Sequence, residues 1–269
     1  VCTIHKINSD ETTSPRGFLD LVGAYERGEL KLDKSAKNIF ESCFLCTSCV
    51  EVCPNSLRVD TAIENVRRDI AEKFGIAWYK KAFFWLLRHR AVMDFCARLG
   101  YVFQSCAFKI REGAMSPRFS LPMVKKERLL PTASKKSFLN SHAEFIDNGG
   151  DKTIGVFIGC MGNYAYTGIG EALVKIAREL GLNLNLMKKQ ACCGAPAYFT
   201  GDFATVEVLA KRNIEYFEKM LGELDAIIVP EATCSAMIKI DYEHFFHDDE
   251  HWRERAKAVS KKIFLATEY

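Results

Sequence analysis

The spacing of apolar residues divides the chain into regions of different periodicity. Between residues 18 and 75, apolar side chains recur every three or four positions, which predicts helices at 17–30 (GFLDLVGAYERGEL) and 59–75 (VDTAIENVRRDIAEKFG). Residues 78–112 keep this spacing among many Lys and Arg side chains, which predicts one or two basic amphipathic helices. Residues 113–152 carry three prolines and a Gly-Gly pair, a composition typical of a linker.

After residue 152 short apolar segments alternate with helical patterns. The expected strands are TIGVFIG (153–159), LNLNLM (182–187), DAIIVP (225–230) and a segment beginning with KIFLA (262–266), and helices are expected at 168–181, 203–222 and 251–262. This alternation predicts a Rossmann-like α/β domain with a parallel sheet and right-handed crossovers. We therefore expect three parts: a helical domain over 1–76, a basic helical connector and linker over 77–152, and a parallel-sheet domain over 153–269.

Charge is unevenly distributed, although the formal net charge is only +3. Residues 78–136 contain 13 Lys and Arg against 3 Asp and Glu, which leaves 24 against 31 for the rest of the chain. Such a basic middle could bind an acidic subunit, an anionic lipid surface or nucleic acid. Because the longest apolar run, Ala82–Leu87, is too short for a membrane helix, we expect none. The chain opens on Val1 rather than Met, so we expect a fragment of a longer protein.

Four of the 11 cysteines form a compact run. Cys43, Cys46, Cys49 and Cys53, followed by Pro54, repeat the C-x2-C-x2-C-x3-C-P pattern of bacterial ferredoxins. Soft thiolates at this spacing can curl around one iron–sulfur cluster. A zinc knuckle is the alternative, but zinc sites usually combine two separated CxxC pairs or add histidines. The run therefore favours iron.

The fourth cysteine of such a run ligates a different cluster in two-cluster ferredoxins. The loop at 43–49 then needs one more thiolate, and Cys2 is the candidate, as the tail of an earlier run. We expect one [4Fe-4S] cluster completed by Cys2, and a second served by Cys53 together with cysteines preceding this chain. Thr3 departs from the pattern, which prefers proline after the last cysteine.

A second set of cysteines follows the predicted strands. Cys160, the adjacent Cys192 and Cys193, and Cys234 each come just after a strand. Because the carboxyl ends of parallel strands meet at one sheet edge, these thiols should converge and could hold a metal centre. Gly194 gives the backbone freedom to present two adjacent thiolates. The alternative is that they are ordinary buried cysteines.

These residues resemble the CCG cysteine-rich family of iron–sulfur proteins. That family includes the iron–sulfur subunits of glycolate oxidase and of anaerobic glycerol-3-phosphate dehydrogenase, the lactate-utilisation proteins and heterodisulfide reductase subunits. Its modules contain a cysteine, a Cys-Cys-Gly triplet and a closing C-x-x-C pair, which Cys160, 192–194 and Cys234 match. Met237 stands where the closing cysteine is common. The segment SPRG (14–17) is similar to one that links two ferredoxin runs in the glycolate oxidase branch.

The resemblance implies an α-helical ferredoxin-like domain with [4Fe-4S] clusters, followed by a CCG domain that holds iron–sulfur or zinc. It implies an electron-transfer subunit without catalytic residues of its own, partnered with an FAD-containing dehydrogenase. The expected substrate is glycolate or lactate, with a quinone or another acceptor. Two alternatives stay open: a heterodisulfide reductase-type thiol–disulfide enzyme acting at the CCG cluster, and the iron–sulfur subunit of anaerobic glycerol-3-phosphate dehydrogenase. We expect a cytoplasmic protein without nucleic-acid partners; contact with the inner membrane surface stays open.

Overall fold

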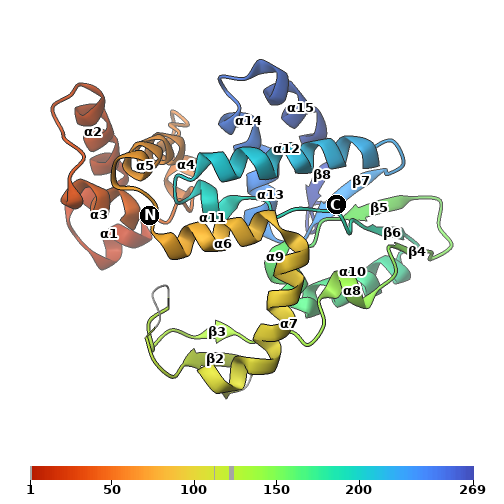
Figure 1. Cartoon of the computed structure of the whole chain (residues 1–269). Coiled ribbons are helices and arrows are strands. Elements are labelled where there is room, and N and C mark those ends of the chain that lie inside the picture. Colours follow the sequence, from red (N-terminus) through yellow and green to blue (C-terminus); the bar gives the residue numbers. More distant parts are fainter. Residues whose placement is uncertain (1, 112, 121–123) are drawn as a thin grey trace. The chain divides into compact units, whose positions relative to one another are not determined.

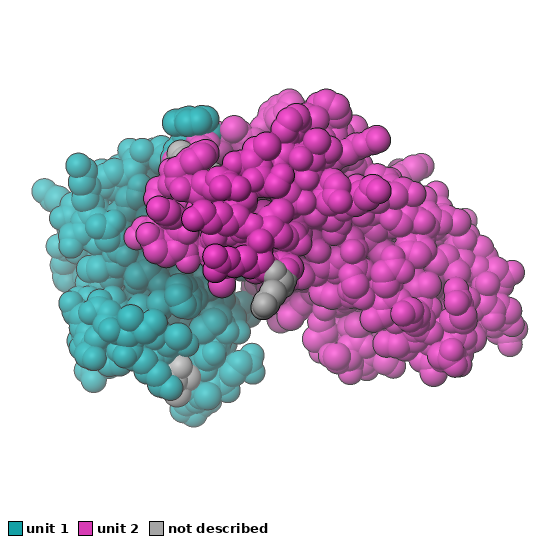
Figure 2. Space-filling view, turned by 90° about the horizontal axis from the view of Figure 1, so that it is seen from below, with its two compact units in different colours: residues 1–78, 196–204 teal, residues 79–195, 205–269 magenta. Residues whose placement is uncertain are grey.

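The helical periodicity of the N-terminal region corresponds to real helices in the computed structural model, which describes residues 2–111, 113–120 and 124–269 (Figure 1). The chain divides into two units (Figure 2). Unit 1 extends to Trp78 and also includes Pro196–Ala204, whereas unit 2 comprises Tyr79–Ala195 and Thr205–Tyr269.

Unit 1 is helical around one apolar core. Its elements are α1 (Thr3–Ile7), the 3-10 turn η1 (Glu11–Thr13), α2 (Pro15–Glu26), α3 (Lys34–Ser42), α4 (Ser48–Glu51) and α5 (Val59–Phe74). On α5 the buried residues Ile63, Val66 and Ile70 recur at helical spacing. They share the core with Phe18 of α2 and Phe40 of α3, so the helix stripes predicted from sequence meet there.

The SPRG segment begins α2. Ser14 accepts a hydrogen bond from the N–H of Gly17 at 2.9 Å, and Pro15 occupies the first helical turn, as is typical of a helix start. A Cβ atom at Gly17 would lie 1.9 Å from the carbonyl oxygen of Glu11, so α2 approaches η1 closely. Compared with the predicted helix at 17–30, α2 begins two residues earlier, at Pro15, and ends earlier, at Glu26.

The basic segment forms two helices, α6 (Trp78–Arg88) and α7 (Arg90–Ala107), as predicted. No helix in the described part of the chain combines the length and the apolar character needed to cross a bilayer.

The expectation of a plain linker at 113–152 is wrong. This region adds β2 (Ala114–Pro117), β3 (Leu130–Pro131), α8 (Phe138–Ser141) and β4 (Phe145–Ile146). Strands β2 and β3 form a small antiparallel sheet with β1 (Phe108–Arg111), which takes the end of the segment 78–112 that was predicted to be helical. These strands are too short for an alternating pattern to stand out among the prolines. Residues 112 and 121–123, which belong to the two predicted segments, lie outside the described residues.

The main sheet of unit 2 confirms the predicted parallel α/β architecture. Its strand order is β4-β6-β5-β7-β8, in which β4 is antiparallel to β6 and the other pairs are parallel. The parallel strands are β5 (Thr153–Val156), β6 (Asn183–Leu186), β7 (Ala226–Val229) and β8 (Ile263–Leu265). The connecting elements are α9 (Gly159–Tyr164), α10 (Thr167–Glu179), α11 (Ala195–Tyr198), α12 (Phe203–Met220), α13 (Ala232–Ala236), the π-helix η2 (Met237–Asp241), α14 (Tyr242–Phe245) and α15 (Glu250–Ser260).

Alternate residues leaving β5 face opposite layers. Ile154 and Val156 share a core with Val174 of α10, whereas the ring of Phe157 meets Phe217 of α12 with centroids 5.7 Å apart. Figure 1 shows α10 and α12 on opposite sides of the sheet. Since β6 and β7 flank β5 on different sides, the chain reverses its direction of winding between β5 and β7. In open α/β sheets ligands bind outside the carboxyl ends of the strands at this reversal.

Candidate metal centres

The cysteine run of unit 1 forms a curled loop between α3 and α5. Leu45 and Thr47 have φ of 50° and 57°, a left-handed conformation that is uncommon for residues with a Cβ atom. These reversals bring the run around one pocket, which is lined by Cys2, Cys43, Cys46 and Cys49. Cys53 lies beyond α4 and does not line this pocket. The grouping is the one expected from sequence; that these four thiols bind a cluster stays a prediction.

The sulfur atoms in this pocket have different surroundings. The N–H of Leu45 donates to Sγ of Cys43 at 3.4 Å, and burial raises the pKa of the Cys43 thiol. Burial also raises the pKa of Cys49. Cys46 is exposed, with its Sγ 3.5 Å from Oγ of Ser48, and this hydrogen bond lowers the pKa of Cys46. A thiolate therefore forms most readily at Cys46 of these three.

Cys46 should consequently react first with iodoacetamide in the metal-free protein. We expect its alkylation at neutral pH to be at least about fivefold faster than that of Cys43, because exposure and thiolate content both favour it. Mass spectrometry of digests taken over time measures both rates in one sample. Ser48→Ala should slow the alkylation of Cys46 and leave the alkylation rate of Cys43 unchanged. Equal alkylation rates of Cys46 and Cys43 in the parent protein would contradict the expectation.

Two residues of this site, Arg67 and Asp60, were not predicted from the cysteine pattern. Arg67 is buried, and its guanidinium donates to the carbonyl oxygens of Phe40 at 3.1 and 2.8 Å, Cys43 at 2.6 Å and Phe199 at 2.8 Å. It thereby satisfies carbonyls at the end of α3 and fixes the first cysteine of the loop. Asp60 lines the pocket while paired with Arg58 at 2.7 Å.

In unit 2 the second set of cysteines lies at the carboxyl edge of the main sheet. Cys160 is in α9 after β5, Cys192 and Cys193 follow β6, and Cys234 is in α13 after β7. The thiol of Cys192 lies beside that of Cys160, and the thiol of Cys193 lies beside those of Cys192 and Cys234. Bonds from both neighbouring thiols lower the pKa of Cys192, and the same contacts raise the pKa of Cys160 and of Cys193. The fold thus brings together the four thiols that the strand pattern predicted.

Two loops hold these thiols close to each other. Gly159 has φ of 71°, and a Cβ atom there would lie 3.0 Å from Sγ of Cys234. Gln190 is buried between the loops: its Oε1 accepts from the N–H of Gly159 at 3.0 Å, and its Nε2 donates to the carbonyl of Met187 at 2.8 Å. Gly194, with φ of 92°, turns the chain after the vicinal pair. Only a residue without a side chain leaves the space beside Cys234 open.

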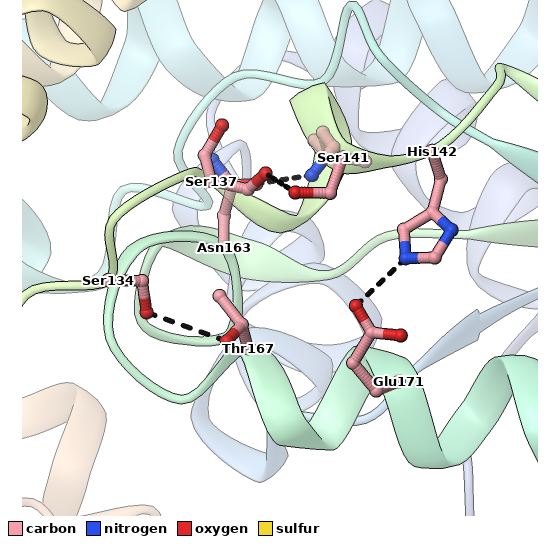
Figure 3. A network of polar contacts seen from close by, with 8 residues as sticks. Ser134, Ser137, Ser141, His142, Asn163, Thr167 and Glu171 are labelled. Carbon is pink, nitrogen blue, oxygen red and sulfur yellow. Dashed lines mark hydrogen bonds and ion pairs between the residues drawn. The ribbon is translucent and has the colours of Figure 1, made fainter. Parts of the chain in front are cut away.

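A polar network fixes the helix that carries Cys160 (Figure 3). Asn163, one turn further along α9, accepts a hydrogen bond from the N–H of Leu139 in α8 at 2.9 Å. Beside it, Nε2 of His142, the residue directly after α8, lies 2.8 Å from a carboxylate oxygen of Glu171 in α10 (Figure 3). Side chains therefore join the α8 segment to both α9 and α10.

A small pocket opens onto Cys160 and Cys192. Arg90 lines it and donates to the carbonyl of Gln190 at 2.9 Å, which places a positive charge beside the thiols. Met237 is fully buried at the start of η2, three residues after Cys234. A thioether is a far weaker ligand than a thiolate, so the candidate ligands in unit 2 are the four thiols.

The thiols of unit 1 surround a pocket rather than a single point, an arrangement that suits a cluster better than a single ion. In a single-ion site the ligand atoms converge on one point, about 2.3 Å from zinc for thiolates, and no group of three or more ligating side chains in the described residues does so. A cubane instead offers a separate iron to each thiolate, so its ligands stand around a larger volume. The pocket of unit 1, with its four cysteines and its N–H···S hydrogen bond, has this character.

Comparison with known families addresses the second site directly. Residues 154–239 match the family model described as "CCG: Cysteine-rich domain", which spans β5 to η2 and includes all four thiols. The chain contains a CCG cysteine-rich domain. The resemblance to the CCG-domain iron–sulfur proteins is thereby confirmed.

Curated relatives extend the likeness beyond the CCG domain. The chain is 28% identical over 262 residues to a "Probable glycolate oxidase iron-sulfur subunit" of Bacillus subtilis, covering 94% of this chain and 58% of that protein. It is 34% identical over 116 residues to "Lactate utilization protein A" of an Exiguobacterium species, covering 43% of this chain and 46% of the relative. The chain thus spans about half the length of these relatives. No solved structure matches it.

Proposed function

We propose that this chain is part of an iron–sulfur subunit that carries electrons from an FAD-linked dehydrogenase of a 2-hydroxy acid, glycolate or lactate, to a quinone or another acceptor. The observation that carries the proposal is the pair of four-thiol sites, one in each unit. The names of the relatives, which refer to glycolate oxidase and lactate utilisation, support the substrate class. In this proposal, unit 1 is the ferredoxin-like domain and unit 2 contains the CCG domain.

In unit 1, Cys2, Cys43, Cys46 and Cys49 would hold a [4Fe-4S] cluster, and Cys53 would serve another one. In unit 2, Cys160, Cys192, Cys193 and Cys234 would hold the CCG centre. A bound cluster supplies one-electron transfer at a potential set by burial, charge and hydrogen bonds to sulfur.

The chain's own residues set that environment. Arg67 contributes a buried positive charge behind Cys43, and Arg90 contributes one beside Cys160. Positive charge near thiolates favours electron uptake, because the added electron makes the site more negative.

Iron content separates this function from its rivals. After anaerobic reconstitution of the whole chain, Cys46→Ser should lose the iron of unit 1, about four atoms per cubane, and keep that of unit 2. Cys193→Ser should show the reverse, and Cys96→Ser, an exposed cysteine of α7, is the matched control. Iron and sulfide analysis with EPR measures the result.

Three outcomes would refute the electron-relay function. If Cys46→Ser binds as much iron as Cys96→Ser, the thiols of unit 1 do not hold a cluster. Zinc in place of iron would favour a structural module. Disulfide reduction by this chain without a flavoprotein, lost in Cys193→Ser, would favour the thiol–disulfide enzyme.

A further inference from the structure

Two buried polar side chains lie behind the vicinal cysteines of the CCG domain. Asn213 in α12 is 1% exposed, and Tyr242 at the start of α14 is fully buried. Asn213 occupies a position that the helical spacing of Val206, Leu209 and Phe217 assigns to the core. A polar side chain in such a place needs hydrogen-bond partners, since an unsatisfied buried group costs about 1–3 kcal/mol.

Those partners are the backbone groups around the two cysteines. Oδ1 of Asn213 accepts from the N–H of Ala191 at 2.9 Å, and Nδ2 donates to the carbonyl oxygen of Cys192 at 3.0 Å. Nδ2 also donates to Oη of Tyr242 at 3.1 Å, and that hydroxyl donates to the carbonyl oxygen of Cys193 at 2.9 Å. Two side chains therefore hold three peptide groups around the pair: one before it, the one between the two cysteines and the one after it.

The chemistry of this arrangement admits few substitutes. The N–H of Ala191 requires an acceptor and the carbonyl of Cys192 a donor, so the Asn213 amide has one orientation. Both of its N–H protons and the proton of Tyr242 are used. Leu at 213 supplies neither donor nor acceptor, and Phe at 242 keeps the ring while removing only the hydroxyl.

Fixing the carbonyls also directs the opposite sides of the peptides. In a trans peptide the N–H points away from the C=O. The carbonyl of Cys193 accepts from Tyr242, so the N–H of the same peptide, that of Gly194, points to the opposite side of the backbone. The hydroxyl of Tyr242 thus fixes the direction of the peptide that follows Cys193.

We propose that Asn213 and Tyr242 are positioning residues for the metal centre of the CCG domain, which orient the peptides of Cys192 and Cys193 so that both thiols face Cys160 and Cys234. This inference rests on the proposed function. Backbone hydrogen bonds to ligand sulfurs stabilise the more negative, reduced state of a cluster, and groups that orient such bonds influence its potential. Asn213 and Tyr242 would therefore influence both the geometry of the site and its redox equilibrium.

A redox titration of the iron-loaded full chain tests the influence on the cluster. In Tyr242→Phe we expect the redox equilibrium of the cluster to move about three- to tenfold toward the oxidised state, because the peptide between Cys193 and Gly194 is no longer fixed. Tyr166→Phe, at an exposed tyrosine of the same unit, should leave the equilibrium unchanged. EPR of the reduced protein follows the change.

Amide hydrogen exchange of the metal-free full chain tests the positioning without any cluster. Exchange in the 190–195 segment should be about tenfold faster or more in Tyr242→Phe and in Asn213→Leu, and unchanged in Tyr166→Phe. If the parent chain takes up no iron in unit 2, the proposed function fails while this measurement still decides whether the two residues hold the loop. The inference is overturned if exchange in Tyr242→Phe equals that of the parent, or if loaded Tyr242→Phe keeps the parent's redox equilibrium.

Discussion

Replacing Arg67 with Met is expected to destabilise unit 1 by about 3–5 kcal/mol. Met matches the length of the aliphatic stem but donates no hydrogen bonds. The carbonyls of Phe40, Cys43 and Phe199 would then lose their charged donor inside the protein, where water cannot replace it. Since the Cys43 carbonyl belongs to the cysteine loop, the loop should loosen together with the end of α3.

Hydrogen exchange of peptides from α3 and α5 measures this loss separately from unit 2. Arg67→Lys should restore little, because one ammonium group cannot reach three carbonyls in the fixed geometry of a guanidinium. Arg16→Met is the control: Arg16 is exposed and 3.8 Å from Asp20, so its loss should cost well under 1 kcal/mol. Similar protection in Arg67→Met and Arg16→Met would mean that Arg67 does not hold the loop.

Apolar periodicity predicted the elements in which buried residues recur at regular spacing along the whole element. Helix α5 and strands β5 and β7 follow directly from apolar spacing, since each buries one or both faces over several residues. The gathering of Cys160 and Cys234 at one edge was also predictable, because it follows from the rule that parallel strands end on the same side.

Contacts between residues that are far apart in sequence could not be predicted from apolar periodicity. Residues 196–204 lie between strands of unit 2 in sequence, yet they belong to unit 1, where the carbonyl of Phe199 receives a hydrogen bond from Arg67. Nothing local encodes that pairing. A partial signal existed for Arg67 and Asn213, because each is a polar residue at a core position of an amphipathic helix. Such a residue indicates a buried network, but its partners emerge only from the folded chain.

Gly159→Ala is expected to abolish most of the iron binding of the CCG domain while unit 1 keeps its own. Two effects combine at this position. Alanine at φ of 71° is strained by about 1–2 kcal/mol, and its Cβ would sit 3.0 Å from Sγ of Cys234. The methyl group would therefore push against a ligand sulfur or displace the turn that carries Cys160. Iron analysis of the reconstituted chain, with EPR to distinguish the two sites, measures the loss.

Gly149→Ala separates the steric effect from backbone strain. Gly149 has φ of 76°, but a Cβ atom there meets nothing within 4 Å. Its substitution should therefore cost similar stability and leave iron binding intact. If Gly159→Ala and Gly149→Ala bind equal iron, the space beside Cys234 is not needed for the metal centre. If both lose the iron of unit 2, strain alone accounts for the effect. Selective loss in Gly159→Ala would show that the absence of a side chain at 159 keeps the site between β5 and β7 open for the cluster.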